Sequence, residues 1–291
     1  MIYECVVNIS SCDNSLLVSK LENAVCETEN SILCDVHSDI DHNRSVFTFV
    51  SRDFISLKNI VKIFIEFCFS ILDIRDHIGV HPRIGVVDVI PFVVYDEDIG
   101  EIDYAKYPEY IYSIHSFAES ISSEFCVPIF LYDYADTKNQ QTLPDIRKFA
   151  FNSIKPDIGN NFPHEQYGAI ALGIRKPLIA INVNLESNDL SIAKRIAFDI
   201  RESSGGYKGV RSLGLNLNSK NSVQVSMNII DLLQTNISDV CLQVKKMADE
   251  LNIKSSVELV GLIPKYHFVK LSAEFLEWSG LNENSIVENY V

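Results

Sequence analysis

The stretch VRSLGLNLNSKNSVQVSMNII, residues 210–230, decides the fold of this chain because it has the pattern of a β-hairpin. Polar and apolar residues alternate over 210–217 and again over 222–230, which is the period of strands with one buried face. The four residues between them, Asn-Ser-Lys-Asn at 218–221, have the composition of a turn. The stretch therefore predicts two neighbouring antiparallel strands.

The segments around this hairpin complete a known order of elements. Before it we expect a strand over 178–185 and a helix over 189–203, and after it a helix over 232–251 and a strand over 256–263. The order β-α-β-β-α-β is that of the split, ferredoxin-like unit. A final helix is expected over 269–278.

The first half of the chain predicts a second layer of the same kind. Its patterns indicate strands at 4–9, at two places within 31–50, at 84–94 and at 127–132, and helices at 15–28, 54–74 and 108–125. We therefore expect an α/β (α+β) protein of two ferredoxin-like subdomains, 1–177 and 178–291, each a mostly antiparallel sheet with helices on its outer face. A ligand is expected in a cleft between two such layers.

Residues 136–168 differ from the rest of the chain because they show little regular pattern. They contain three prolines and Gly159, and only a short helix is expected, after Pro144. A long irregular segment inside a compact protein is usually functional. We interpret this one as a linker that also contacts a ligand.

The charge of the chain excludes several classes of partner. Of the 291 residues, 47% are hydrophobic and 22% are charged, and the formal net charge is −14. Binding to nucleic acid or to an anionic membrane needs a basic face, so neither is expected. An anionic small molecule is not excluded, because a few arginines in a cleft reverse the sign of the charge locally.

Cysteine usage and hydropathy indicate the cytoplasm. The seven cysteines are odd in number, no two have C-x-x-C spacing, and most lie in apolar runs, which is typical of reduced core residues. The N-terminus has no signal-peptide pattern. The longest apolar segment, 60–74, is interrupted by Lys62, Glu66 and Asp73, so no membrane span is predicted.

His81 is the strongest candidate for acid–base chemistry. Pro82 directs it away from helical geometry, onto a loop before a buried strand, and Arg83 places a cation two residues away. An imidazole that titrates near neutral pH suits a general base, although capping of the preceding helix is the alternative. His77 is four residues away, but Gly79 and Pro82 disfavour the helix that a metal pair would need, and no metal is expected.

Asp88 and an acidic turn are two further polar features of the first half. Asp88 lies inside the apolar run IGVVDVIPF, where it either orients a histidine or arginine, or is bonded to backbone or to an arginine for structural reasons. Asp35, Asp39 and Asp41, with Arg44 close behind, are interpreted as a solvated turn rather than a site.

The second half offers basic residues around a glycine-rich stretch. In RESSGGYKGVRS, Arg201, Lys208 and Arg211 flank exposed backbone N–H groups, and could clamp carboxylates or simply border a common turn. The sequence contains no G-x-x-x-x-G-K-[ST], no G-x-G-x-x-G, no G-x-S-x-G and no H-E-x-x-H. A nucleotide loop is therefore not supported.

Several stretches, taken in order, resemble the formiminotransferase family. In the first half they are ECVVNIS at 4–10, HNRSVFTFV at 42–50, HIGVHPRIGVVDVIPFV at 77–93, VPIFLYDYA at 127–135, LPDIR at 143–147 and KPDIG at 155–159. In the second half they are IRKPLIAINVNL, RESSGGYKGVRSLGLNLNSKNSVQVSMNIID and VELVGLIP. Together they cover most of the chain, including both halves.

This resemblance implies a fold and a reaction. Two α/β subdomains would face each other across a folate-holding tunnel in a homodimer, without the cyclodeaminase domain that some relatives carry. The protein would transfer a formimino group from N-formimidoyl-L-glutamate to the co-substrate tetrahydrofolate, in histidine degradation and one-carbon metabolism. The products would be glutamate and 5-formimidoyltetrahydrofolate, and the enzyme would use no metal.

The resemblance also assigns residues. The histidine of the H-P-R motif, His81, would be the general base, and Arg44 and Arg83 are candidates for holding substrate carboxylates. The folate-binding loop would be Gly159, Asn160, Asn161, Phe162, Pro163, His164, Glu165, Gln166, Tyr167 and Gly168.

One segment departs from the family pattern. Where the family reads V-P-N-F-S-E-G-R, this chain reads V-V-N-I-S-S-C-D from Val6 to Asp13, which keeps Asn8 and Ser10 but lacks the glutamate, glycine and arginine. The alternatives are therefore a formyltransferase between glutamate and folate, or a folate-binding protein of this fold without turnover.

Overall fold

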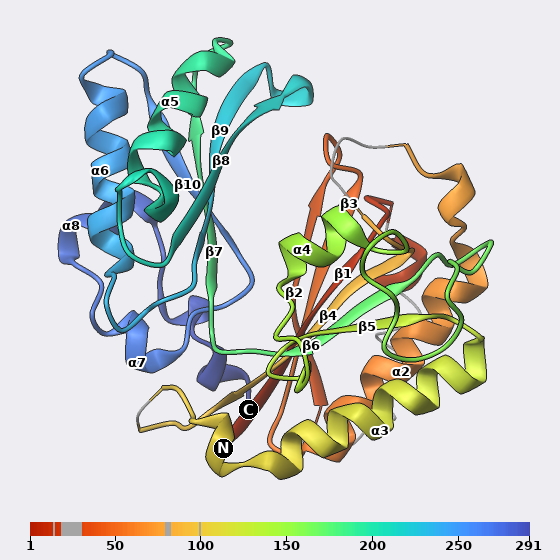
Figure 1. Ribbon diagram of the computed structural model, residues 1–291. Coiled ribbons are helices and arrows are strands. Elements are labelled where there is room, and N and C mark those ends of the chain that lie inside the picture. The colour runs from red at the N-terminus through yellow and green to blue at the C-terminus, as the bar shows by residue number, and fades with distance from the viewer. Residues whose placement is uncertain (14, 19–30, 79–82, 99) are drawn as a thin grey trace. The chain divides into compact units, whose positions relative to one another are not determined.

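The chain forms two compact units, each with its own sheet and core. The computed structural model describes residues 1–13, 15–18, 31–78, 83–98 and 100–291. Unit 1 comprises Met1–Asp96, Glu101–Lys176 and Val291, and unit 2 comprises Glu97–Gly100 and Pro177–Tyr290 (Figure 1). The fold is mixed α/β with two mostly antiparallel sheets, as expected from the sequence. A tunnel between the sheets stays a prediction.

Unit 1 contains a six-stranded sheet with the order β2-β3-β1-β4-β6-β5. The strands are β1 (Ile2–Ile9), β2 (Ser31–Asp39), β3 (Arg44–Ser51), β4 (Val87–Tyr95), β5 (Ile129–Asp133) and β6 (Ile170–Ile174). Pairing is antiparallel from β2 to β4, and β6 runs parallel to both β4 and β5. The first four strands thus have the ferredoxin-like order, and two parallel strands extend it.

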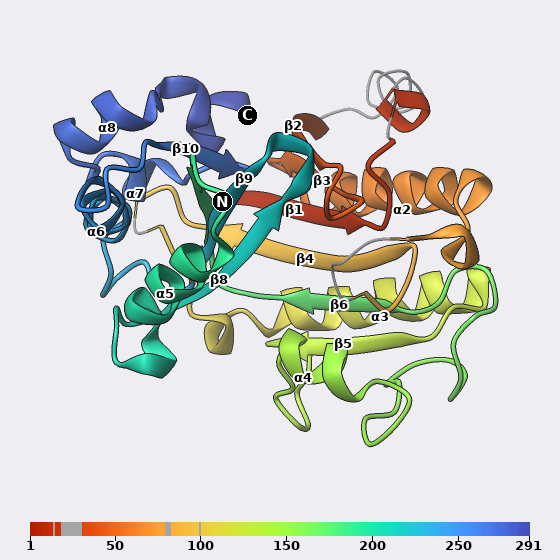
Figure 2. The ribbon, with the colours of Figure 1, turned by 90° about the horizontal axis from the view of Figure 1, so that it is seen from above.

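Two long helices, α2 (Phe54–Ile71) and α3 (Pro108–Phe125), cover one face of this sheet (Figure 2). Because side chains alternate along β1, Cys5, Val7 and Ile9 all point into the core beneath these helices. The helix α2 begins where the side chain of Asp53 accepts a hydrogen bond from the backbone N–H of Ser56 at 2.8 Å. The opposite face packs against the short helix α4 (Leu143–Phe149).

Unit 2 contains the four-stranded antiparallel sheet predicted from its hairpin, in the order β10-β7-β9-β8. Its main elements are β7 (Ile179–Leu185), α5 (Leu190–Ile200), β8 (Val210–Leu217), β9 (Ser222–Ile229), α6 (Ile237–Asp249) and β10 (Ser255–Val260). Leu217 pairs with Ser222, and Asn221 adopts the left-handed conformation (φ 50°) that closes the turn. The hairpin and the ferredoxin-like order are confirmed.

The short strand β6 was not predicted, although it joins β4 to β5. Its five residues, IALGI, are all buried, so the run has neither the alternation of a half-exposed strand nor enough length to be distinguished from a loop. A Cβ on Gly173 would lie 2.5 Å from the ring of Tyr132 on β5. The glycine therefore lets an aromatic ring pack directly over the strand.

Other differences concern where helices begin and end. The helix expected over 232–251 begins at Ile237 because the Asn236 side chain caps it. The one expected over 269–278 is two short helices, α7 (Lys265–Phe268) and α8 (Ala273–Ser279). Residues 15–18 are helical, and the rest of the helix expected over 15–28 lies outside the described residues.

Short 3-10 helices complete the described structure: η1 (Ile74–Asp76), η2 (Tyr104–Lys106), η3 (Glu202–Ser204), η4 (Asn218–Lys220), η5 (Glu283–Ser285) and η6 (Val287–Tyr290). None of the helices in the described ranges is both long enough and apolar enough to cross a membrane.

Candidate active site

The expected general base, His81, lies outside the described residues, as do residues 79, 80 and 82. Both flanks of the H-P-R loop are described. They are His77, which follows η1, and Arg83, which precedes β4. The surroundings of these flanks therefore define the candidate site.

Asp88, at the start of β4, connects the H-P-R loop to a distant helix. Its side chain is only 4% exposed. One carboxylate oxygen accepts a hydrogen bond from the backbone N–H of Ile84 at 2.8 Å, and the other accepts one from Nη2 of Arg147 at 2.6 Å. Asp88 is thus bonded both to backbone and to an arginine, and it fixes the residues that follow the loop.

Arg44, the first residue of β3, lies in the same region. Its guanidinium donates a hydrogen bond to the side-chain oxygen of Asn8 on β1. Burial and the positive charges of Arg147 and Arg83, opposed by Asp88, together lower the pKa of Arg44 to about 10. The group is still protonated at neutral pH.

Arg44, Arg83 and Arg147 form what we call the arginine cluster. Asp88 contributes one negative charge against their three positive charges, in a chain whose overall charge is strongly negative. Burial, together with Arg147, lowers the pKa of Arg83, and Asp88 raises it. Guanidinium groups bind carboxylates through paired hydrogen bonds, so the cluster can hold an anionic substrate.

Two residues of the arginine cluster, Arg44 and Arg83, border a small hollow in unit 1. The hollow has a volume of about 10 Å³ and is lined by Ile9, Ser10, His42, Arg44, Arg83 and Asp88. That is room for about one water molecule, so a substrate carboxylate would replace water here or bind at the mouth. Arg44 and Arg83 were predicted from the sequence, and the structure brings them together.

Arg147 was not identified as a site residue, although it ends the LPDIR stretch. Its side chain is 18% exposed and reaches the cluster from α4. Its Nε atom is buried, and no atom in the described part of the chain forms a hydrogen bond with it. Arg147 therefore adds a donor to the site that only the tertiary structure reveals.

Ser10, which the sequence keeps from the family motif, joins three segments at the end of β1. Its hydroxyl donates a hydrogen bond to the carbonyl oxygen of Gly85 at 2.7 Å. Its backbone N–H donates one to the carbonyl oxygen of Val86 at 2.8 Å. Its own carbonyl oxygen lies 2.8 Å from Nδ1 of His77. Ser10 thus holds both His77, before the H-P-R loop, and Gly85 and Val86, after it.

In the acidic turn, which the sequence indicated to be solvated, Asp39 is half-buried and has a histidine partner. This carboxylate pairs with Nδ1 of His42 at 2.9 Å and also accepts the backbone N–H of His42 at 2.9 Å. Burial opposes these hydrogen bonds, but together they lower the pKa of Asp39 to about 2. Asp39 therefore holds His42, which lines the hollow.

The expected folate loop, 159–168, is fixed to the site at its C-terminal end. The backbone of Gln166 accepts a hydrogen bond from Ile74 of η1 at 2.8 Å, and Glu165 pairs with Arg75 at 3.1 Å. Gly168 forms an isolated β-bridge with Gly85. A Cβ on Gly168 would lie 2.3 Å from the carbonyl oxygen of Ile84, so the close approach requires glycine.

Aromatic stacking holds the same end of the loop. Tyr167 stacks on His164, with ring centroids 4.3 Å apart, and on Phe69 of α2, with centroids 4.0 Å apart. The tip differs, because Asn160, Asn161, Phe162 and Pro163 are exposed, and Phe162 is 64% exposed. A fixed base and an exposed aromatic tip suit a loop that receives a ligand with flat rings.

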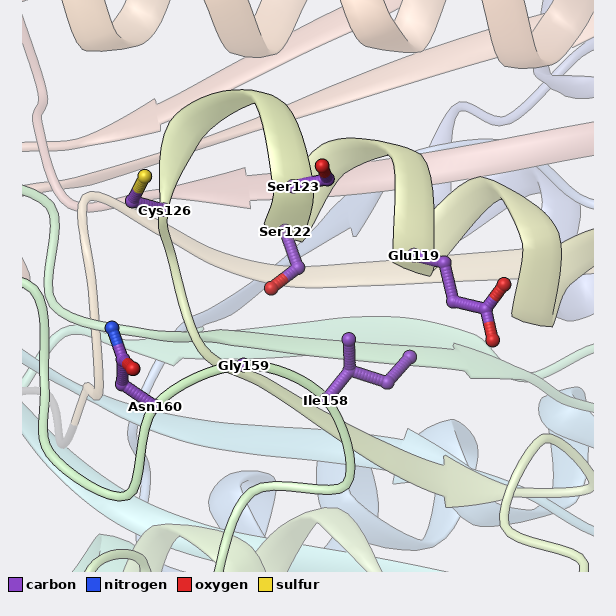
Figure 3. A pocket seen from close by; sticks show the side chains of 7 residues that line it. All are labelled: Glu119, Ser122, Ser123, Cys126, Ile158, Gly159 and Asn160. Carbon is purple, nitrogen blue, oxygen red and sulfur yellow. The ribbon is translucent and has the colours of Figure 1, made fainter.

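The N-terminal end of the loop forms a separate surface pocket with the end of α3 (Figure 3). This pocket, of about 330 Å³, is lined by Glu119, Ser122, Ser123, Cys126, Ile158, Gly159 and Asn160. It shares no lining residue with the hollow beside the arginine cluster. The structure thus joins the C-terminal part of the expected loop to the H-P-R flanks, while its first residues line a different pocket.

The glycine-rich stretch of unit 2 does not form the carboxylate clamp considered above. Glu202 occupies that position, pairing with Lys208 and accepting the backbone N–H of Gly209 at 2.9 Å. Arg201 donates to Ser204 at 2.7 Å and lies over the ring of Phe198. The stretch is therefore a turn in which Lys208 pairs with Glu202 and Arg201 bonds to Ser204. Across the described part of the chain, no three His, Cys, Asp or Glu residues are placed to hold a metal ion.

Comparison with known proteins identifies the family. The family model "Formiminotransferase domain, N-terminal subdomain" matches residues 2–175, and "Formiminotransferase domain" matches residues 180–289. A glutamate formimidoyltransferase of Streptococcus pyogenes is 31% identical over 100% of this chain and 98% of its own length. One of Thermoplasma acidophilum is also 31% identical, over 98% of this chain and 95% of its own.

The bifunctional relatives match over part of their length only. The formimidoyltransferase-cyclodeaminase of Sus scrofa is 30% identical over 96% of this chain but only 53% of its own length. The matches to the family models and to full-length relatives agree with the residue patterns and with the two-unit fold. The chain therefore belongs to the formiminotransferase family of transferases.

Proposed function

We propose that the protein transfers a formimino group from N-formimidoyl-L-glutamate to tetrahydrofolate, giving 5-formimidoyltetrahydrofolate and glutamate. The names of two relatives that match nearly the whole chain support the donor. The folate acceptor and the pathway, histidine degradation and one-carbon metabolism, follow from the family resemblance.

The observation that carries the proposal is the arginine cluster. Both substrates carry the carboxylates of a glutamate moiety, and a protein of net charge −14 would repel these groups without a local reversal of charge. Arg44, Arg83 and Arg147 provide that reversal beside the H-P-R loop. A carboxylate held there is oriented as well as attracted, because Asn8 holds the guanidinium of Arg44 and Asp88 holds that of Arg147.

In the proposed mechanism, His81 acts as the general base. It removes the proton from N5 of tetrahydrofolate as that nitrogen adds to the amidine carbon, and the carbon becomes tetrahedral. The bond from this carbon to the glutamate nitrogen then breaks, and the imidazolium returns the proton to the departing amine. The role rests on the position of His81 between two described flanks, His77 and Arg83.

The proposal places folate against the loop 159–168. The exposed ring of Phe162 offers a stacking surface, while the stacked Tyr167 keeps the base of the loop in place. Gln166 and Glu165 connect this base to η1 and hence to the H-P-R loop. Binding of folate at the tip would therefore be coupled mechanically to the reacting centre.

The altered segment after Ser10 is the reason for considering a formyltransferase or a folate-binding protein without turnover. Asp13 is exposed and does not line the hollow, and the backbone N–H of Cys12 donates to Asn43 at 2.9 Å. The retained Ser10 contacts residues on both sides of the loop, Gly85 and His77. These observations favour turnover over a folate-binding protein without activity.

The direct test is a turnover assay of the purified protein with tetrahydrofolate and each donor in turn. We expect 5-formimidoyltetrahydrofolate from formimidoylglutamate, and little product from formylglutamate. Product from formylglutamate alone would favour the formyltransferase. Folate binding with no product from either donor would favour the non-catalytic alternative, and no folate binding would leave family membership only. The homodimer and the cytoplasmic location stay predictions.

A further inference from the structure

One ring nitrogen of His77 is an unused hydrogen-bond acceptor beside the arginine cluster. Its Nδ1 lies 2.8 Å from the carbonyl oxygen of Ser10. A carbonyl oxygen only accepts hydrogen bonds, so Nδ1 must carry a proton, and in the neutral ring Nε2 then has a free lone pair. Nε2 is buried, and within the described ranges no atom forms a hydrogen bond with it. A buried polar atom without a partner calls for an explanation.

The second contact of Nδ1 does not change this assignment. Nδ2 of Asn43 lies 3.3 Å from it, but that amide already donates to the carbonyl oxygen of Ile78 at 2.8 Å. The amide nitrogen of Asn43 is a donor like the protonated Nδ1, so it is the carbonyl oxygen of Ser10 that holds the ring at this edge. The opposite edge, which bears Nε2, is left for another partner.

The charges near His77 favour the neutral ring. Burial and the positive charge of Arg83 lower the pKa of His77, while the hydrogen bond to Ser10 and the charge of Asp88 raise it, and the net direction is downward. At neutral pH the ring therefore accepts a hydrogen bond at Nε2 rather than presenting a second cation.

Ser10 places this acceptor next to the anion site. Ser10 lines the hollow together with Arg44 and Arg83, and its carbonyl oxygen holds His77. Ser10 thus lies between an atom that can accept a hydrogen bond from an N–H group, Nε2 of His77, and arginines that can donate hydrogen bonds to a carboxylate. An α-amino acid whose nitrogen is acylated or formimidoylated presents the matching pair, because its carboxylate and its N–H are attached to the same carbon.

We propose that Nε2 of His77 accepts a hydrogen bond from the N–H of the one-carbon donor while the arginine cluster holds its α-carboxylate. This inference rests on the proposed function and adds to it a residue that recognises N-substituted amino acids. The bond would fix the rotation about the bond between the nitrogen and the α-carbon, and so aim the amidine carbon at the attacking nitrogen.

Two substitutions distinguish the proposed role of His77 in binding the donor from a purely structural role. In His77→Asn the amide can still donate to Ser10, because its nitrogen occupies the place of Nδ1, but nothing replaces Nε2. In His77→Gln the longer side chain places an amide near Nε2 and loses the contact with Ser10. If His77 only anchored the loop, His77→Asn would behave as the wild type and His77→Gln would be the defective variant.

The experiment measures donor recognition with two non-reacting probes, N-acetyl-L-glutamate and N-acetyl-N-methyl-L-glutamate, which lacks the N–H. Titration calorimetry gives the dissociation constant of each for the wild type and for His77→Asn. We expect the wild type to bind the first probe roughly tenfold more tightly than the second. We expect His77→Asn to bind the two nearly equally, with an unchanged melting temperature.

Steady-state kinetics give a second readout. In His77→Asn the KM for formimidoylglutamate should rise about tenfold while the KM for tetrahydrofolate stays the same. The inference would be overturned if His77→Asn distinguished the two probes as well as the wild type does and kept the wild-type KM for formimidoylglutamate. This holds even if the protein proves to be an active transferase. A wild type that neither binds the probes nor transfers a formimino group would overturn both the inference and the proposed function.

Discussion

The carboxylate of Asp88 and the guanidinium of Arg147 meet at 2.6 Å, although 59 residues separate them in the sequence. Both side chains are largely buried, and the second oxygen of Asp88 holds the backbone of Ile84. The pair thus connects α4, β4 and the loop that carries the proposed catalytic histidine. A buried ion pair of this kind is strongly destabilising when one partner is removed, because the other keeps its charge away from water.

Replacing Asp88 by Asn should therefore destabilise unit 1. The Asn oxygen can still accept from Ile84, but Arg147 is left unpaired next to Arg44 and Arg83. We expect the free energy of unfolding to fall by about 3–5 kcal/mol in urea denaturation followed by circular dichroism. The double variant Asp88→Asn with Arg147→Met should recover part of that loss. A loss below about 1 kcal/mol in the single variant would show that the pair is not critical.

Replacing Arg83 by Lys should impair binding of the donor more than folding. Lysine keeps the charge but cannot form two parallel hydrogen bonds to a carboxylate. We expect the KM for formimidoylglutamate to rise roughly tenfold or more, with a smaller change in kcat. The matched control is Arg195→Lys on the exposed surface of α5, which should behave as the wild type. Equal kinetics for the two variants would remove Arg83 from the carboxylate site.

Replacing Phe162 by Ala tests the folate loop. Because the side chain is 64% exposed, its loss should leave the melting temperature unchanged. If the ring stacks on folate, the dissociation constant for tetrahydrofolate should rise about tenfold, since an aromatic contact is worth about 1 kcal/mol or more. Tyr112→Ala, which removes an equally accessible ring from α3, serves as the control. Unchanged folate affinity in Phe162→Ala would place the ligand elsewhere.

The buried ring of His267 in α7 should make stability depend on pH. Burial and the nearby charge of Lys270 lower the pKa of His267 to about 4, from 6.5. Between these values the unfolded chain binds a proton that the folded chain does not, so stability falls as the pH decreases from 6.5 to 4. The full effect is roughly 3 kcal/mol.

The measurement is the free energy of unfolding at several pH values between 4 and 7, for the wild type and for His267→Leu. The leucine variant cannot bind the proton and should lose this part of the pH dependence. Parallel curves for the two proteins would show that His267 does not titrate as proposed.

An element could be predicted from the sequence when the residues that determine it are neighbours in the chain. The hairpin at 210–230 could be predicted because the alternation of polar and apolar residues and the composition of the turn are both properties of consecutive residues. The strand β6 could not, because it is buried on both faces and is recognisable only between β4 and β5. The grouping of Arg44 with Arg83 came from the family resemblance and not from a pattern in the residues.

The site residues that sequence reasoning missed depend on contacts between distant segments. Arg147 joins the cluster through Asp88, and nothing in LPDIR indicates that pairing. His77 was considered only as half of a metal pair, because its relevant neighbour, the carbonyl of Ser10, lies 67 residues away in the sequence. Tertiary structure alone shows which edge of its ring remains available.

The central claim is that His81 drives transfer of the one-carbon group from glutamate to tetrahydrofolate. The most direct measurement is a single-turnover experiment with donor labelled with ¹³C at the formimino carbon, using the wild type and His81→Ala. We expect the label on N5 of tetrahydrofolate with the wild type, and a rate at least about a hundredfold lower with the variant, whose melting temperature should be unchanged. Label that stays on glutamate with the wild type, or equal rates for the two proteins, would contradict the account.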